Sequence, residues 1–263
     1  MTSSVDMTTG PLNASADERE DVQPGSAMGS WAAHARLWSV AMAALAIDLW
    51  TKDWAFETLR PSEVRDAIPG LLTFRRSINS GALFGLGKGL VPLFIVASFV
   101  ALGFVLYLFA CSGRNRKSLH LALSLVLAGS LGNLYDRSFV IADQIEVVDS
   151  ISGQARTLVG KIKKDDPDKS YVLVGQAPDG AEPRPVLRRE IASVSTVGVV
   201  RDFLKFEPKI AGMDTWPWIF NVADSLLVIG VIILLLNFWF ERKHGTGSDK
   251  ADAVSAVSDD HSP

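Results

Sequence analysis

The apolar residues of this chain are concentrated in four long stretches that polar segments separate. The four stretches are Leu37 to Phe56, Gly89 to Cys111, Leu119 to Leu134 and Ile219 to Phe240. Because about 20 apolar residues in a helix cross the roughly 30 Å hydrocarbon layer of a membrane, the pattern predicts four transmembrane helices. We expect the short third helix to extend toward Arg137. The first stretch could instead be a cleaved signal peptide, but the acidic segment before it favours a retained helix.

A different pattern separates the third and fourth stretches. Residues 138–197 form short β-like runs with Asp-Asp-Pro-Asp and Pro-Asp-Gly turns between them, which predicts a small β domain, such as a four- or five-stranded barrel. Residues 31–137 would hold helices one to three, and 198–244 a loop and helix four. Residues 1–30 and 245–263 are polar, so we expect disordered tails. The predicted fold class is an all-α membrane bundle of four transmembrane helices with a small extracytoplasmic β domain inserted between helices three and four.

Charge and composition narrow the possible partners and cofactors. The formal net charge of -3 gives no global basic field, so we expect no nucleic acid partner. A single cysteine, Cys111, excludes an internal disulfide, and the four histidines form no HExxH motif, so we expect no metal and no cofactor. Basic residues follow helices two and four, which predicts that both termini are cytoplasmic. These residues are Arg114, Arg116, Lys117, Arg242 and Lys243.

Each predicted helix also has polar residues near one end. The sets are Asp48 with Lys52, Asn79 to Gly85, Asn133 to Arg137 and Asn221 to Ser225. In an antiparallel bundle these ends meet at the external membrane face, and spacings of three and four residues place the helical sets each on one side of a helix. Taken singly, the sets resemble an ion pair, a turn, a snorkelling pair and a helix cap. Their convergence on one face predicts a shared functional site, because polar residues inside a membrane are costly.

Five short motifs follow one another along the membrane part of the chain. They are "DLWTK" (Asp48 to Lys52), "NSGALFG" (Asn79 to Gly85), "GNLYDR" (Gly132 to Arg137), "GVVRDF" (Gly198 to Phe203) and "FNVADS" (Phe220 to Ser225). Through them the chain resembles the lipoprotein signal peptidases, also called signal peptidase II. The resemblance implies an aspartic endopeptidase of the bacterial cell membrane. Its substrate would be a lipid-modified prolipoprotein, cut on the amino side of the diacylglyceryl-modified cysteine at the external face, in contact with membrane lipid. We expect a monomer.

The resemblance implies a catalytic pair formed by Asp202 and Asp224. Asp149 also follows two valines and lies nearer to Arg137, but it lacks the glycine four residues earlier and the phenylalanine directly after it. Two features depart from the family pattern: the inserted residues 138–197, and Arg201, which stands where an apolar residue is common.

Other motif positions receive roles from the same resemblance. Those that would orient the pair, the substrate backbone or the oxyanion are Asn79, Gly81, Asn133, Arg137 and Asn221. Those with a supporting role are Asp48, Lys52 and Asp136. The "NSGALFG" stretch would form part of an external β-like platform over the site.

Two carboxylates about 4 Å apart repel by roughly 4 kcal/mol at an effective dielectric near 20, so one of them keeps a proton. The ionised partner can then activate water while the protonated one polarises the scissile carbonyl.

Two alternatives remain open at this point. Ser80 or Ser225 near Lys52 would make a Ser/Lys protease. Asp48 and Asp224 as proton carriers would make a small proton-coupled transporter, which predicts charges near the middle of the membrane.

Overall fold

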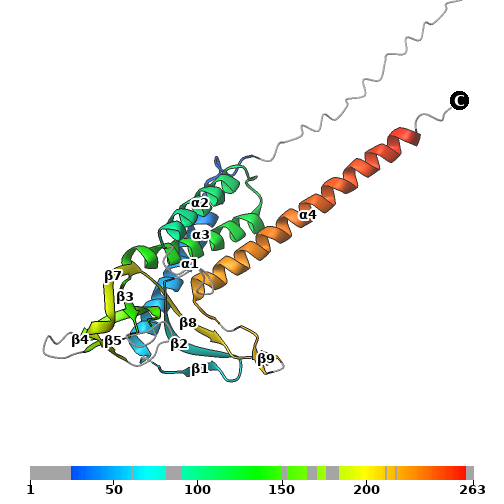
Figure 1. Ribbon diagram of the computed structural model, residues 1–263. Helices are drawn as coiled ribbons and strands as arrows, with labels where there is room; N and C mark the ends of the chain where they lie inside the picture. Colours follow the sequence, from blue (N-terminus) through cyan, green and yellow to red (C-terminus); the bar gives the residue numbers. More distant parts are fainter. Residues whose placement is uncertain are drawn as a thin grey trace, which may run out of the picture.

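The computed structural model describes residues 25–60, 62–80, 91–149, 153–164, 171–175, 184–210, 212–216 and 218–258. Within this part of the chain the helices are α1 (Trp31–Thr58), α2 (Val91–Ala110), α3 (Lys117–Phe139) and α4 (Val222–Ser258). They lie together at one end of the molecule, and the strands lie at the other (Figure 1). By length and composition α1, α3 and the Val222–Arg242 part of α4 can each cross a membrane, whereas the apolar part of α2, Ile95–Ala110, is shorter. The chain is therefore a membrane protein.

Helix α3 is the centre of the bundle and packs against α1, α2 and α4. Its apolar contacts include Leu123 and Leu127, which are buried together with Leu37 of α1 and Phe109 of α2. Glycine allows α4 to come very close: a Cβ atom at Gly129 would lie 2.5 Å from the Ala223 carbonyl oxygen. Small residues at such crossings are typical of packed membrane helices, since they let two backbones approach.

Both tails differ from the sequence prediction, whereas the end of α3 agrees with it. Helix α3 extends past Arg137, as predicted. Residues 25–30, which we expected to belong to a disordered tail, instead contact the α2–α3 link, where the Ala27 amide donates to the Ser112 carbonyl at 2.9 Å. The predicted tail 245–263 is also helical as far as Ser258, because extending an existing helix adds a hydrogen bond for each residue fixed. Residues 1–24 and 259–263 of the two tails lie outside the described part.

A four-stranded antiparallel sheet covers the end of the bundle, and the sequence analysis did not predict it. Its order is β1-β2-β8-β11, and its strands are β1 (Arg65–Ile68), β2 (Leu72–Asn79), β8 (Val200–Phe206) and β11 (Ile219–Phe220). A short hairpin of β9 (Lys209–Ile210) and β10 (Met213–Asp214) follows β8. Asp202, expected in a loop, therefore lies on a strand. The membrane part is not purely helical, because segments more than a hundred residues apart pair here, with Ser77 opposite Asp202.

The residues inserted between α3 and β8 form a second antiparallel sheet, in the order β6-β5-β4-β3-β7. The strands are β3 (Ile141–Val148), β4 (Ala155–Lys164), β5 (Tyr171–Gly175), β6 (Arg184–Leu187) and β7 (Ile191–Gly198). Only the short 3-10 helix Arg188–Glu190 joins the two outer strands, so the sheet curls back on itself. Its core is aliphatic and consists of Ile145, Val147, Val174 and Val186.

The two ends of the inserted sheet meet at its base. Ile141 pairs with Gly198, and the Val199 amide donates to the Val140 carbonyl at 3.0 Å. Gly198 rests on the backbone of α3, where an added Cβ atom would lie only 1.9 Å from the Arg137 carbonyl oxygen. The insertion therefore leaves the fold and returns to it at nearly the same point, so β8 keeps its place beside the end of α3.

Candidate functional site

Polar side chains from α1, α3, β8 and α4, and from the residue just before α4, meet where the helix bundle reaches the β1-β2-β8-β11 sheet. We call them the polar cluster, which consists of Asp48, Lys52, Asn133, Asp136, Asp202, Asn221 and Asp224. All except Asp224 are less than 9% exposed. Buried polar groups are stable only when they have partners, so the hydrogen bonds of each member decide what the site can do.

Two asparagines connect Asp202 on β8 with Asp224 in the first turn of α4. The Asn221 side-chain nitrogen donates to Asp202 Oδ1 at 2.6 Å, and Asn79 at the end of β2 donates to Asp202 Oδ2 at 3.1 Å. The Asn133 side-chain nitrogen donates to Asp224 Oδ1 at 2.8 Å. The Asn221 nitrogen also donates to Asn133 Oδ1 at 3.2 Å, which closes the chain of contacts. Neutral amide donors thus hold both carboxylates in one network.

Asn221 is at the same time the N-terminal cap of α4. Its Oδ1 accepts from the Asp224 amide at 3.0 Å, and its own amide donates to Asp224 Oδ2 at 3.3 Å. This reciprocal arrangement is the capping box that the spacing of the two residues suggested. Asn221 can therefore be both a helix cap and a member of the site, because the cap fixes the position of the Asp224 carboxylate.

Lys52 provides the buried cation beside this network. Its Nζ donates to Asp48 Oδ2 at 2.8 Å and to Asn133 Oδ1 at 3.2 Å, and it lies 3.5 Å from Asp136 Oδ2. Asp48 Oδ1 in turn accepts from the Ala223 amide at 2.7 Å, in the first turn of α4. Gly132 makes this possible, because a Cβ atom there would lie 2.3 Å from Asp48 Oδ2. The pair on α1 therefore anchors the start of α4.

Two arginines flank the polar cluster. Arg201 faces Asp136 and Asp53, away from its neighbour Asp202, because successive side chains of a strand point to opposite faces. Arg137, near the end of α3, interacts electrostatically with Asp224 and Asp202. Arg137 is therefore the arginine that interacts with the pair of carboxylates, whereas Arg201 is paired with other acidic residues.

Burial raises the pKa of the Asp202 carboxyl well above its usual range, and the nearby Asp224 carboxylate raises it further. Hydrogen bonds from Asn79 and Asn221 and the charge of Lys52 oppose this effect. Burial and the neighbouring carboxylate thus both favour the protonated form of Asp202.

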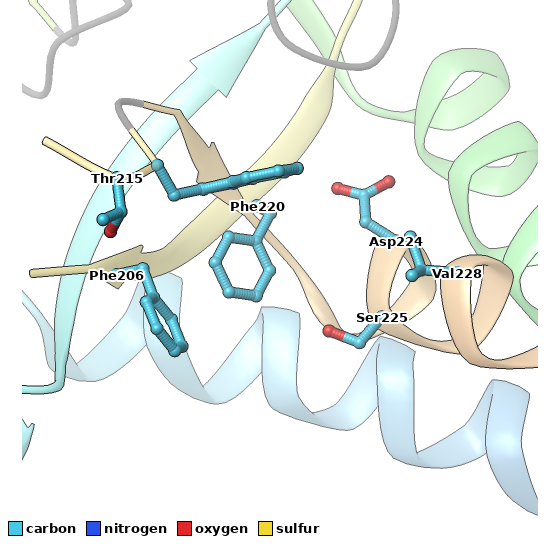
Figure 2. Close-up of a pocket in the computed structure, with 7 residues that line it drawn as sticks. Phe206, Thr215, Phe220, Asp224, Ser225 and Val228 are labelled. Carbon is cyan, nitrogen blue, oxygen red and sulfur yellow. The ribbon is translucent and has the colours of Figure 1, made fainter. Parts of the chain in front are cut away.

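An apolar cavity of about 410 Å³ opens beside Asp224. Figure 2 shows Asp224 and Ser225 at one side of it, on the first turn of α4, and Phe206 and Phe220 on the side of the sheet. Trp216 also lines it. The cavity was not predicted from the sequence, because its lining residues lie between positions 206 and 228 and come together only in the folded chain.

The structure separates the competing candidates of the sequence analysis. Asp149 lies in the turn after β3, at the end of the inserted sheet far from its base, roughly 25 Å along an eight-residue strand. The described partners of Lys52 include neither Ser80 nor Ser225, and the Ser225 hydroxyl donates to the Asn221 carbonyl. Gly81 and the rest of "NSGALFG" after Ser80 lie outside the described residues, so the predicted platform is seen only at its first two positions.

Comparison with known sequences gives one consistent result. The family described as Signal peptidase (SPase) II matches residues 40–240. A lipoprotein signal peptidase of Bifidobacterium longum subsp. infantis is 41% identical over 103 residues, which cover 37% of this chain and 53% of that protein. The chain thus spans about half the length of that relative.

Longer matches are more distant. A lipoprotein signal peptidase of Streptococcus pyogenes serotype M1 is 25% identical and covers 76% of this chain and 91% of its own. That of Rhodopirellula baltica is 28% identical, covering 77% and 71%. A solved structure described as a bacterial membrane enzyme has a similar fold, with a TM-score of 0.52 at 21% identity, over 79% of this chain and 90% of that one.

Proposed function

The chain belongs to the signal peptidase II family, and from that premise we propose that it is a membrane-embedded aspartic endopeptidase that matures prolipoproteins. Its substrate is a prolipoprotein whose cysteine already bears a diacylglyceryl group. The enzyme cuts the peptide bond on the amino side of that cysteine and releases the signal peptide. Both termini of the enzyme lie in the cytoplasm, and the polar cluster lies at the external face of the bacterial cell membrane.

One observation carries the proposal: Asn133 and Asn221 hold the carboxylates of Asp202 and Asp224 in one buried network. An aspartic mechanism needs two nearby carboxylates that share a proton. The elevated pKa of Asp202 supports a pair of carboxylates that holds a proton. The ionised member takes a proton from water, and the resulting hydroxide adds to the carbonyl that the protonated member polarises. The tetrahedral intermediate then collapses as the amine leaves with a proton.

The position of the cavity supports a lipidated substrate. It lies directly beside Asp224, at the end of a membrane helix, and its wall includes Phe206 and Val228. A diacylglyceryl group anchors its cysteine at the membrane surface, so the peptide bond before that cysteine lies at the same depth as the first turn of α4. Apolar side chains near the scissile bond fit the cavity by their chemistry.

The transporter alternative has less support. It calls for ionisable groups near the middle of the membrane. Asp224 lies in the first turn of α4, and Asp202 lies on a strand outside the helices. Asp48, which is within α1, is paired with Lys52 and the Ala223 amide, so it has partners that a transported ion would have to displace.

Replacement of the aspartates tests the proposal directly. We expect Asp202→Asn and Asp224→Asn each to reduce cleavage of a diacylglyceryl-modified precursor by about 100- to 10,000-fold. The side-chain amide of the introduced asparagine cannot accept or donate the proton that the reaction requires. Cleavage is measured on purified enzyme in lipid by the change in precursor size. Asp66→Asn, an exposed aspartate on β1, is the matched control and should retain the wild-type rate.

Two further variants address the serine alternative. Ser80→Ala and Ser225→Ala should both cleave the precursor, since neither hydroxyl has a part in the aspartic mechanism. Retained cleavage by Asp202→Asn or Asp224→Asn would refute the aspartate pair. Loss of cleavage in a folded Ser80→Ala or Ser225→Ala variant would favour a serine nucleophile instead.

A further inference from the structure

Arg201 occupies the position where the sequence departs from its family, and its contacts are unusually numerous. Its backbone amide donates to Asp136 Oδ2 at 2.9 Å. Its guanidinium donates to Asp136 Oδ1 from Nη2 at 2.8 Å and from Nε at 3.2 Å, and also reaches Asp53. The Arg201 side chain is 12% exposed, while that of Asp136 is fully buried. Charge-assisted contacts of this kind are strong and fix the planes of both groups.

Asp136 has a second cation within reach, and this creates a competition. Lys52 Nζ lies 3.5 Å from Asp136 Oδ2, which is longer than its contacts with Asp48 at 2.8 Å and Asn133 at 3.2 Å. Lys52 therefore contacts Asp48 and Asn133 closely, and Asp136 only weakly. Arg201 is the group that satisfies Asp136 in this arrangement, since it provides three donors to the same carboxylate.

Arg201 supplies the second of the two cations that face the fully buried carboxylates of the site. Two fully buried carboxylates, Asp48 and Asp136, face two cations, Lys52 and Arg201. The remaining charged groups around them are Asp53 on α1, Arg137 on α3, Asp202 on β8 and Asp224 on α4. Without Arg201, the buried Asp136 carboxylate would attract Lys52, because an unpaired buried charge is strongly destabilising.

We propose that Arg201 is a positioning residue for the aspartate pair: by neutralising Asp136, it keeps the Lys52 ammonium on Asp48 and Asn133. Asn133 in turn donates to Asp224. Displacement of Lys52 toward Asp136 would leave Asn221 as the remaining described donor to Asn133 Oδ1 and would loosen the amide that holds Asp224. The proposal rests on the proposed function, because its effect is read through cleavage.

Arg201 has a second consequence for the insertion. Residues between Asp136 and Arg201 include the whole inserted sheet, and the contact between these two residues lies at its base. Closing a long loop costs conformational entropy that local contacts must offset. An arginine at this position therefore ties β8 to α3 despite the intervening domain, whereas an apolar residue would provide no such connection.

The test compares Arg201→Met, Arg201→Lys and Arg65→Met in the same cleavage assay. Arg65 is the matched control, because it is an arginine of the same sheet in an exposed ion pair with Glu63. For Arg201→Met we expect kcat to fall by about 10- to 100-fold with little change in KM, since small displacements at a reacting centre have effects of this size. The pH–rate profile of Arg201→Met should shift to higher pH by roughly half a unit, because the aspartate pair loses a nearby positive charge.

Arg201→Lys separates the charge from the geometry. It should restore the pH–rate profile but only part of kcat, because an ammonium cannot form the forked contact. Thermal unfolding of each variant in the same lipid shows which ones are folded. If Arg201→Met fails to fold, Arg201→Lys alone decides, with wild-type kcat contradicting the proposal.

The outcomes distinguish this inference from the proposed function. If Asp202→Asn is inactive but a folded Arg201→Met keeps the wild-type kcat and pH–rate profile, the positioning role is wrong and the aspartic mechanism stands. If wild-type protein does not cleave the lipidated precursor, the proposed function fails before any Arg201 variant is considered. A reduced kcat with an unchanged pH profile in Arg201→Met and a fully active Arg65→Met would indicate a structural contact only, and would also overturn the proposal.

Discussion

The inserted sheet buries Ile145, Val147 and Val174, whereas the polar cluster buries Asp48, Lys52 and Asp202. An aliphatic side chain gains from burial without regard to direction, so neighbouring side chains can adjust when one of them changes. A buried polar group needs a partner at a particular distance and angle, and removing one partner leaves another group unsatisfied. The inserted sheet and the polar cluster should therefore respond very differently to small changes in sequence.

Apart from replacement of the aspartates themselves, the largest effect should come from one methyl group added beside the polar cluster, at Gly132. In Gly132→Ala the new Cβ atom would lie 2.3 Å from Asp48 Oδ2, so Asp48 must move away from Lys52 and from the Ala223 amide. We expect cleavage to fall by about 100-fold, as displacement near reacting groups does. The rate of precursor cleavage measures it.

The control for this change is Gly103→Ala. Gly103 lies in α2, and an added Cβ atom there meets no atom within 4 Å, so activity and thermal stability should stay at the wild-type level. Equal losses of activity in both variants would contradict this prediction, because the contact with Asp48 would then not distinguish Gly132 from Gly103.

A smaller effect concerns the dependence of stability on pH. The pKa of Asp202 is raised in the folded state, mainly by burial, above its value of about 4 in the unfolded chain. Above about pH 4 the unfolded chain releases this proton first, so the contribution of Asp202 to the free energy of unfolding falls as pH rises toward the folded pKa.

Asp202→Asn lacks this titration. Its melting temperature relative to wild type should therefore rise by a few degrees between pH 4 and pH 8, as thermal unfolding in lipid at several pH values would measure. A difference from wild type that stays constant over this range would contradict the elevated pKa.

The smallest effect on cleavage should follow deletion of most of the inserted sheet. Gln144 on β3 pairs with Ser195 on β7, so residues 145–194 can be replaced by an Asn-Gly turn that joins the two strands at a register suited to a tight hairpin. We expect the cleavage rate to change by less than about threefold, because none of the deleted residues belongs to the polar cluster. Thermal stability should fall, since Val159 leaves the group that it forms with Ile78 and Val199.

This deletion also determines whether the insertion acts in cleavage. If the shortened protein folds but its cleavage rate is reduced by about 100-fold for several precursors, the inserted sheet takes part in substrate handling. The comparison between a tolerant sheet and a sensitive cluster would then be wrong. Loss of activity for only one precursor would instead assign the insertion a role in substrate choice.

The sequence by itself determined the helices and the members of the polar cluster. Apolar stretches of about 20 residues are sufficient to identify membrane helices, and spacings of three and four residues place side chains on one helical face. The order of the five motifs also distinguished Asp202 from Asp149, and the structure places only Asp202 in the cluster. The helices and the faces of their polar residues are local features, because each depends on residues that are close together along the chain.

Tertiary structure alone decided the sheet that carries Asp202 and the pairing of Arg201. Strand β2 meets β8 across more than a hundred residues, and Arg201 meets Asp136 across the whole insertion. The need for glycine at position 132 is likewise set by Asp48, on another helix. Patterns along the chain record which residues are apolar or polar, but a hydrogen bond or a close contact depends on distances in space. Those distances exist only after the helices and strands have packed.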